Sequence, residues 1–369
     1  MLAIKCKKLV TVTGPVIDDG VLIIDDGKIK EIGDKSISIP DGAEVVDVSD
    51  KWVYPGFIDA SLRISGINGS DDSVSPQLKI IHSVDPDGKS IEDVRYSGVT
   101  TCFAAPGPGG IIDGQGAAIK LKKAESAEEM IIQGSEQMCF TLGDEALFAS
   151  KMRKRPPFTR MGLADMLRDA LTKAGTTAAA EEFSVNRDRK IDALIPVVKG
   201  EMTARFECLK AMDITAAVNI AEEFNLEYVI VGAFEAHKVP EFLKKHKTPV
   251  ILEALPYGSR CLEFVDPYDV NFESAGILEK NGNLQCITIN QAGPAEMLPI
   301  FAGFATAYGL SRQSALESVT IGAARQLRLE DRIGSLEVGK DADIAVFTGD
   351  ALLNTSHCHM AFVEGERVY

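Results

Sequence analysis

Histidine is scarce in this sequence, which contains five histidines among 369 residues. Histidine is the side chain that most often binds transition metals in proteins. An enzyme of this size that hydrolyses its substrate with bound metal would need most of the five in one place. They lie instead at His82, His237, His246, His357 and His359. This scarcity bears directly on what chemistry the chain can perform.

The sequence also lacks a long apolar run, a secretory signal and paired cysteines. No stretch of about 18 uninterrupted apolar residues occurs, as a membrane-spanning helix would need. Residues 1–8 have neither the apolar core nor the small-residue cleavage site of a signal peptide. The seven cysteines are odd in number, far apart and never in a CxxC pair, which indicates reduced, buried thiols rather than disulfides or a zinc knot. We therefore expect a cytoplasmic protein with no membrane partner.

Basic residues are outnumbered, with 39 Lys and Arg against 54 Asp and Glu and a formal net charge of -15. Affinity for nucleic acid depends on clustered cations that displace counterions from the phosphate backbone, so the charge balance argues against a nucleic-acid partner. The one dense basic run, residues 151–155, is short. We interpret it as a solvated loop, with a binding loop as the alternative.

Short apolar runs separated by turns mark both ends of the chain as β-structure. At the amino end they are residues 9–12, 21–24 and 28–32, and the last two flank an Asp26-Gly27 pair. This pair predicts a two-residue hairpin, because both central positions of a type I′ turn need positive φ. The carboxyl end has the same pattern of short apolar runs separated by turns, at residues 342–347, 360–363 and 367–369. The two ends therefore predict one small sheet domain built from both termini.

The middle of the chain alternates between predicted strands and predicted helices. Residues 100–104, 228–231, 249–252 and 285–289 have the apolar composition of buried strands, and residues 161–173, 214–224 and 239–245 have helical apolar spacing. Such alternation is typical of parallel βα units. On periodicity alone, a doubly wound sheet and a barrel both remain open.

Several motifs resemble the amidohydrolase superfamily. Residues 53–60 (VYPGFIDA) are similar to the strand that opens its barrel, and residues 331–343 (DRIGSLEVGKDAD) to its return into a small β domain. Other segments resemble the imidazolonepropionase-related branch: residues 98–101 (GVTT), 106–110 (PGPGG), 114–116 (GQG), 160–162 (RMG), 213–214 (DI) and 221–224 (AEEF). The resemblance implies an α/β fold: a (β/α)8 TIM-type barrel at 55–334, and a composite β-sandwich from 1–54 plus 335–369. It places the active site at the carboxyl ends of the barrel strands.

The same resemblance implies a site for zinc or another divalent metal, but the positions that should hold it are changed. Relatives carry His-x-His on the first barrel strand, since residues i and i+2 point to the same side and reach one ion. Here those positions are Ser61 and Arg63. Later ligand positions hold Glu207, Gly232 and, in place of the final aspartate, Asn290. We expect no metal ion and no other cofactor at this site.

Arg63 carries a permanent positive charge to the place where a dication should lie. We hypothesise that it occupies this space and pairs with Glu207 in a bidentate contact. The alternative is an eroded barrel mouth in which Arg63 reaches solvent.

Five further residues are candidates for binding a ligand. They are His82, Gly109, Gly110, Gln115 and Arg160. The glycine-rich segment 106–116 could cradle an anion with its backbone N–H groups, although a structural turn is the more ordinary interpretation. We expect His357 and His359, the one His-x-His of the sequence, to be a surface pair in the terminal β domain. Cys139 and Cys208 have no evident activating base.

Three functions remain open from the sequence. The first is a protein related to hydrolases of non-peptide C–N bonds, of the cyclic amide or imidazolone type, whose metal-dependent hydrolysis is absent or altered. Such a protein could bind a small polar molecule or act as the partner of an intact relative. The second is a working hydrolase with an atypical metal site or without metal. The third is a purely structural or interaction role with a vestigial pocket. A homo-oligomer is the expectation for this fold.

Overall fold

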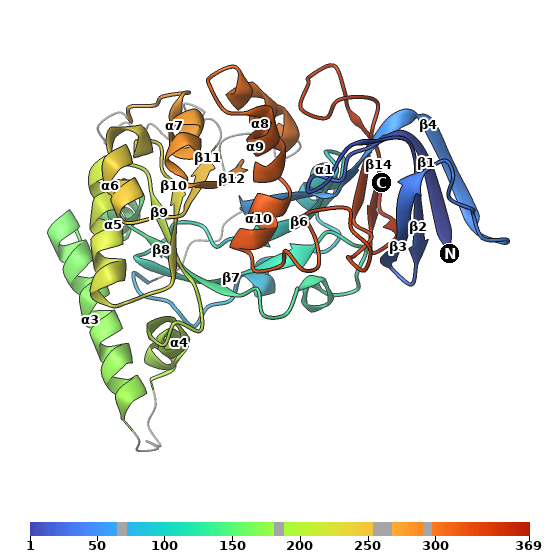
Figure 1. Cartoon of the computed structure of the whole chain (residues 1–369). Coiled ribbons are helices and arrows are strands. Elements are labelled where there is room, and N and C mark those ends of the chain that lie inside the picture. Colours follow the sequence, from blue (N-terminus) through green and yellow to red (C-terminus); the bar gives the residue numbers. More distant parts are fainter. Residues whose placement is uncertain (65–71, 181–187, 254–267, 291–296) are drawn as a thin grey trace.

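The computed structural model describes residues 1–64, 72–180, 188–253, 268–290 and 297–369. Its strands form two sheets, one of seven strands from the two ends of the chain and one of eight strands from the middle. Figure 1 shows the terminal sheet standing beside the eight-stranded sheet, with most helices gathered around the latter. The mixed α/β class and the joining of both termini in one sheet are as predicted.

The terminal sheet has the strand order β15-β14-β13-β4-β1-β2-β3. Its strands are β1 (Leu2–Leu9), β2 (Ile17–Asp25), β3 (Lys28–Asp34), β4 (Glu44–Pro55), β13 (Ile344–Phe347), β14 (Cys358–Val363) and β15 (Glu366–Arg367). The predicted hairpin is confirmed: β2 and β3 are antiparallel, and Asp26 and Gly27 between them both have positive φ, of 50° and 72°. The first strand was predicted too late, at 9–12.

The two ends of the chain form one hydrogen-bonded sheet that is separate from the barrel sheet, which is consistent with the expected terminal sandwich domain. The sheet has a core of its own, because apolar side chains from six of its strands, β1 to β4, β13 and β14, belong to one buried cluster. The cluster includes Ile4, Leu22, Ile29, Val53, Val346 and Phe362.

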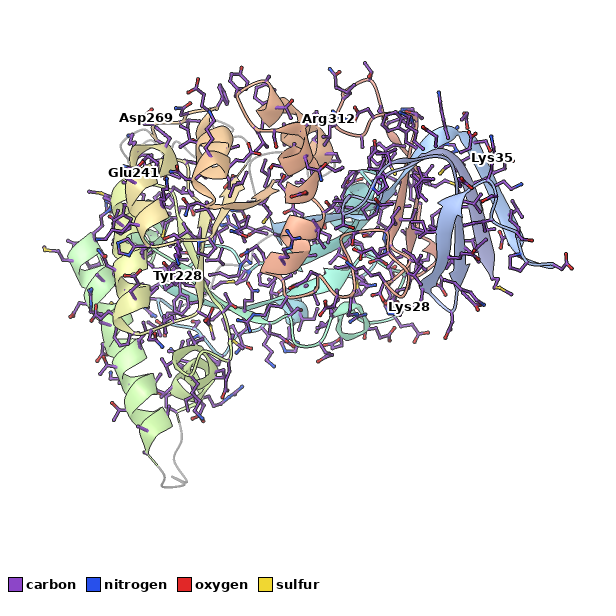
Figure 2. The ribbon with its side chains drawn as sticks, viewed as in Figure 1. Lys28, Lys35, Tyr228, Glu241, Asp269 and Arg312 are labelled. Atoms are coloured by element: carbon purple, nitrogen blue, oxygen red, sulfur yellow. The ribbon has the colours of Figure 1, made fainter. Side chains whose placement is uncertain are left out.

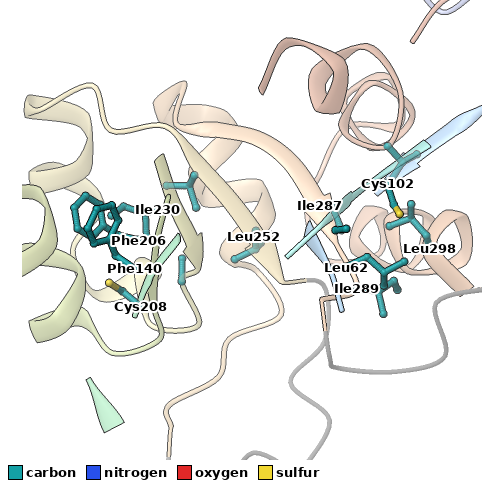
Figure 3. Packing of buried hydrophobic residues seen from close by; sticks show 14 of the residues in the cluster. Leu62, Cys102, Phe140, Phe206, Cys208, Ile230, Leu252, Ile287, Ile289 and Leu298 are labelled. Atoms are coloured by element: carbon teal, nitrogen blue, oxygen red, sulfur yellow. The ribbon is translucent and has the colours of Figure 1, made fainter. Parts of the chain in front are cut away.

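The eight-stranded sheet runs β5-β6-β7-β8-β9-β10-β11-β12 and is nearly closed into a barrel. Its strands are β5 (Phe57–Leu62), β6 (Val99–Ala104), β7 (Ile112–Lys120), β8 (Gln137–Thr141), β9 (Ala204–Cys208), β10 (Tyr228–Gly232), β11 (Val250–Glu253) and β12 (Leu284–Thr288). The first and last strands meet through a parallel bridge between Leu62 and Asn290. In Figure 3, Leu62 and Ile289 lie together at this closure.

The barrel departs from a regular (β/α)8 repeat at β7. This strand is antiparallel to both β6 and β8, whereas all the other neighbouring pairs are parallel. A short glycine-rich connection between β6 and β7 replaces a helical crossover, which an antiparallel pair does not need. Gly114, Gln115 and Gly116, expected in a loop, are part of β7.

Helices follow most of the other strands. They are α1 (Lys89–Arg95), α2 (Asp144–Arg153), α3 (Arg160–Ala179), α4 (Arg189–Val198), α5 (Ala211–Glu223), α6 (Pro240–Lys245), α7 (Ser274–Asn281), α8 (Leu298–Thr306), α9 (Arg312–Ser318) and α10 (Ile321–Gln326). The predicted helices at 161–173, 214–224 and 239–245 fall on α3, α5 and α6. No described helix is long and apolar enough to cross a bilayer.

Strand alternation divides the barrel residues between two cores. On β9, Phe206 points outward and stacks on Phe140 of β8, with ring centroids 4.8 Å apart. Ile58, Phe103 and Ile251 belong instead to an inner cluster that also contains apolar side chains of α10. Several of these inner residues come early in their strands, so α10 closes the barrel at the amino ends and leaves the carboxyl ends for the site.

A buried ion cluster joins the barrel to the terminal sheet. Lys120, at the end of β7, is 2% exposed and lies 2.5 Å from Asp341, 3.1 Å from Asp343 and 3.2 Å from Glu364. Lys28 reaches Asp341 from the terminal sheet, and it is labelled in Figure 2. Three carboxylates around one ammonium tie together the residues of the 331–343 motif and the barrel.

Candidate functional site

Arg63 and Glu207 form an ion pair at the carboxyl ends of the barrel strands. Arg63 follows β5, and Glu207 lies near the end of β9. The Arg63 Nη2 atom lies 2.5 Å from both carboxylate oxygens of Glu207, and the side chains are 4% and 13% exposed. The contact was expected to be a fork of two nitrogens, but a single nitrogen bridges both oxygens. Arg63 does not reach solvent, so the alternative of an eroded barrel mouth is wrong for this side chain.

Asn290 connects this pair to a second carboxylate. Its Nδ2 donates to Glu207 Oε1 and to Glu253 Oε2, at 3.3 Å in each case. Its backbone has a φ of 49°, a left-handed conformation that asparagine tolerates better than most residues. An aspartate here would add a third negative charge beside two buried carboxylates. The amide instead donates to both, which suits a site without a cation at that position.

Gly232, at the end of β10, occupies a backbone conformation that excludes a larger residue. Its φ is +89°, and a Cβ atom would lie 2.6 Å from Leu209 Cδ2. A histidine at this position would therefore be strained and would displace Leu209. The glycine contributes no side chain to the site.

Arg205 lies two residues before Glu207 on β9, so the two side chains are on the same face of the strand. It was not among the residues predicted from the sequence. It is 2% exposed, donates to Gln137 Oε1 at 2.9 Å and to the Ala60 carbonyl at 2.6 Å, and lies over the Phe103 ring at 4.1 Å. Burial lowers the pKa of this guanidinium from its ordinary value. The barrel interior thus carries a second cation beneath the first.

Asp113 of β7 is a second missed residue, and it explains the glycine-rich segment. Its Oδ1 accepts from the backbone N–H groups of Gly109 (2.8 Å) and Gly110 (2.6 Å), and its Oδ2 accepts from the Thr141 hydroxyl at 2.6 Å. The predicted anion cradle therefore exists but holds the chain's own carboxylate. Burial raises the pKa of Asp113 to about 7, against the hydrogen bonds from Thr141 and the glycines, and Glu207 adds to the rise.

A small hollow opens among these residues. Its lining comprises Ser61, Ala105, Pro106, Asp113, Cys139, Phe140, Thr141, Arg205, Glu207 and Val231. The hollow is small: about 10 Å³ is open to the centre of a water-sized molecule, which is about what one water needs. Ser61, a predicted site residue, is 3% exposed, and its carbonyl accepts from Thr288. The structure thus brings Ser61 and Glu207 to one hollow, with Arg63 and Asn290 bonded to Glu207 at its edge.

None of the five predicted ligand-binding residues is among those that line this hollow, and Gly109 and Gly110 bind Asp113 instead. The His82 side chain is 70% exposed and lies 3.8 Å from Glu128, on the surface, because the short 3-10 turn that carries it buries Ile80 and Ile81 instead. Gln115 donates to the Pro76 carbonyl, since its place in β7 turns it toward that segment. Arg160 also lies outside the hollow, at the start of α3.

Arg160, the first residue of α3, joins three helices. It donates to Asp213 at 2.7 Å and to Asp144 at 2.6 Å, and Lys210 lies 3.0 Å from Asp144. Gly143 beside this network has a φ of +115°, and a Cβ there would lie 2.3 Å from Asp213. The network is structural: it fixes the starts of α2, α3 and α5 against one another.

The six described cysteines and the histidine pair 357/359 offer no activated nucleophile. All six described cysteines are buried, whereas Cys261 lies outside the described residues. Burial raises the pKa of Cys139 to about 12, so its thiolate is not populated at neutral pH. His359 lies on β14 of the terminal sheet, and His357 is the residue immediately before β14. Both are far along the chain from the barrel strands.

The residues present give a divalent ion a poor set of ligands. Within the described ranges, no group of three or more His, Cys, Asp or Glu side chains is arranged to hold a metal. The Arg63 guanidinium lies against both Glu207 oxygens, on the side from which a cation would bind. The nearby donors that remain are hard oxygens, without imidazole.

The missed residues left weak signals in the sequence. Glu253 directly follows the apolar run of β11, where the carboxyl end of a barrel strand is expected. Arg205 and Glu207 alternate with apolar neighbours, which indicates two polar residues on one face of a strand. Asp113 gave no such signal, since the glycines around it indicate a loop.

The amidohydrolase family model matches residues 285–368. In its fold, the chain is similar to an amidohydrolase from Thermotoga maritima MSB8, with 29% identity, a TM-score of 0.91 and complete coverage of both chains. An imidazolonepropionase of Clostridium tetani (strain Massachusetts / E88) is 24% identical over 375 residues, covering 90% of this chain and 84% of the relative.

A third relative, amidohydrolase tasK of Hapsidospora irregularis, is 24% identical over 377 residues. The alignment covers 90% of this chain but 38% of that protein. The chain therefore spans well under half the length of this relative, and the matched unit lies within a larger protein there.

Proposed function

We propose that this chain, which belongs to the imidazolonepropionase-related branch of the amidohydrolase superfamily, binds a small polar molecule at its barrel mouth without the metal-dependent hydrolysis of C–N bonds. The observation that carries the proposal is the buried Arg63–Glu207 ion pair. The guanidinium supplies a fixed positive charge at the position where relatives would place a metal-binding histidine. The change at Asn290 fits the same interpretation, since its amide replaces a carboxylate.

Unsatisfied polar atoms indicate what kind of molecule would bind. Among the described residues, Arg63 Nε and Nη1 are buried without a hydrogen-bond acceptor, and Asn290 Oδ1 is buried without a donor. A buried polar atom without a partner costs about 1–3 kcal/mol, so water or a ligand is expected to satisfy these three. A compound that offers both a carbonyl oxygen and an N–H group, such as a cyclic amide or urea, matches the two donors and the acceptor.

The experiment is a thermal-shift screen of the purified protein with small cyclic amides, cyclic ureas and small carboxylates. We expect at least one cyclic amide or urea to raise the melting temperature of the wild type, because a ligand that binds the native state stabilises it. The Arg63→Met variant should lose this shift. Arg168→Met, which breaks an exposed pair with Glu223 (40% and 46% exposed), is the matched control and should keep it. Equal shifts in all three proteins would contradict binding at Arg63.

A hydrolase that works without metal is the second candidate. The observation that favours it is the buried Asp113 carboxyl, which lines the same hollow as Glu207. Two carboxyl groups in different environments can divide the roles of proton donor and proton acceptor. Turnover of a cyclic amide by chelator-treated protein, lost in Asp113→Asn, would establish this activity.

A further inference from the structure

The two oxygens of the Asp113 carboxyl have different surroundings. Oδ1 receives the backbone N–H groups of Gly109 and Gly110, which can only donate. Oδ2 faces the hydroxyl of Thr141, which can donate or accept. A proton on this carboxyl must therefore reside on Oδ2, because a proton on Oδ1 would collide with two N–H groups.

Protonation at Oδ2 reverses the hydrogen bond to Thr141. In the charged state the Thr141 hydroxyl donates to Oδ2, at 2.6 Å. In the neutral state Oδ2–H donates to Thr141 Oγ1, and the threonine hydrogen is free to rotate away. Thr141 is 2% exposed and lines the hollow together with Asp113. The hydroxyl hydrogen can then point into the hollow.

Charged and titratable groups face this pair from the neighbouring strands. Glu207 and Arg205 project from β9, and Cys139 lies beside Thr141 on β8. The Glu207 charge disfavours ionisation of Asp113. The Arg205 charge has the opposite effect, because a nearby cation favours the ionised form of an acid; it lowers the pKa of the Cys139 thiol in this way.

We propose that Asp113 and Thr141 form a proton relay that opens into the hollow beside Glu207. This inference rests on the proposed function in so far as the relay serves a molecule, or a water, bound in that hollow. Asp113 stores the proton and Thr141 passes it on.

The transfer conserves protons and electrons. The bond from hydrogen to Asp113 Oδ2 breaks while the same hydrogen binds Thr141 Oγ1, and the original threonine hydrogen passes to a lone pair of the bound molecule. Asp113 becomes a carboxylate, Thr141 is again a neutral hydroxyl, and the bound molecule gains one proton. The reverse sequence removes a proton from that molecule. No oxidant, reductant or further reactant takes part.

The experiment follows carboxyl protonation in protein labelled with 13C-aspartate, by infrared spectroscopy between pH 5 and pH 9. We expect a buried carboxylic acid band in the wild type that ionises near neutral pH and is absent in Asp113→Asn. Asp59 is the internal control: burial raises its pKa to about 6 and it has no contact with Thr141, so its band should persist in every variant.

Threonine variants test the hydrogen bond between Asp113 and Thr141 on which the relay depends. Thr141→Val removes the donor to the charged form and should raise the Asp113 midpoint by about one pH unit. Thr141→Ser keeps a hydroxyl and should restore the wild-type midpoint. An Asp113 carboxyl that stays ionised throughout, or an unchanged midpoint in Thr141→Val, would overturn the relay. Neither result depends on ligand or metal binding, so failure of the proposed function is measured separately.

Discussion

Removing Arg63 should destabilise the fold far more than removing an exposed arginine. Arg63 is 4% exposed, and its partner Glu207 is 13% exposed. The Arg63→Met variant removes the guanidinium that contacts both Glu207 oxygens, and the Asn290 amide that also contacts this carboxylate, at 3.3 Å, is neutral. Breaking a buried pair by removing one partner costs about 3–5 kcal/mol. Since Glu207 retains some exposure, we expect the lower end, about 3 kcal/mol.

The assay is urea unfolding followed by circular dichroism, in buffer with a chelator so that no metal replaces the arginine. Arg168→Met is the control, because its ion pair with Glu223 is 40% and 46% exposed and should contribute less than about 1 kcal/mol. Adding Glu207→Gln to Arg63→Met should recover about 2 kcal/mol, because it removes the carboxylate charge that has lost the Arg63 guanidinium. Equal free energies of unfolding for Arg63→Met and Arg168→Met would refute the reasoning.

Three further predictions concern the same barrel. Gly232→Ala should lower the free energy of unfolding by about 2 kcal/mol in urea titrations, because its φ is +89° and Leu209 lies 2.6 Å from the new Cβ. Asn290→Asp should destabilise the protein at pH 8 and much less at pH 5, where the added carboxyl is neutralised. An equal loss at both pH values would contradict this. Burial raises the pKa of Asp113 from 3.8 to about 7. The folded chain therefore binds a proton that the unfolded chain releases. This stabilisation is complete below about pH 4 and is lost as the pH rises through 7, so the wild type should lose about 2 kcal/mol relative to Asp113→Asn between pH 5 and pH 8.

The elements that could be predicted are those whose backbone geometry depends on a few neighbouring residues. The Asp26-Gly27 hairpin followed from the positive φ that its two residues can adopt, and β10 to β12 followed from compact apolar runs. The reversed strand β7 could not be predicted in this way. Its glycines suggest a turn, and they are accommodated in a strand because neighbouring backbone approaches closely: a Cβ on Gly114 would lie 2.6 Å from the Leu78 carbonyl oxygen.

The part of the candidate site that lies at the carboxyl ends of the barrel strands could be predicted from the sequence. Arg63, Glu207 and Asn290 are distant in sequence, but a barrel brings the carboxyl ends of its strands together, so their proximity followed from the fold. Arg205 and Asp113 were missed for a different reason. Their roles depend on which neighbour lies across the barrel, such as Phe103 beneath Arg205, and no local pattern encodes that contact.

The metal content of the purified protein tests the central claim most directly. Protein expressed with zinc, iron and manganese in the medium, and purified without chelator, should carry far less than one metal ion per chain by inductively coupled plasma mass spectrometry. The reason is that the Arg63 guanidinium lies 2.5 Å from both oxygens of Glu207. One tightly bound zinc, iron or manganese ion per chain, lost together with activity on chelation, would contradict the account.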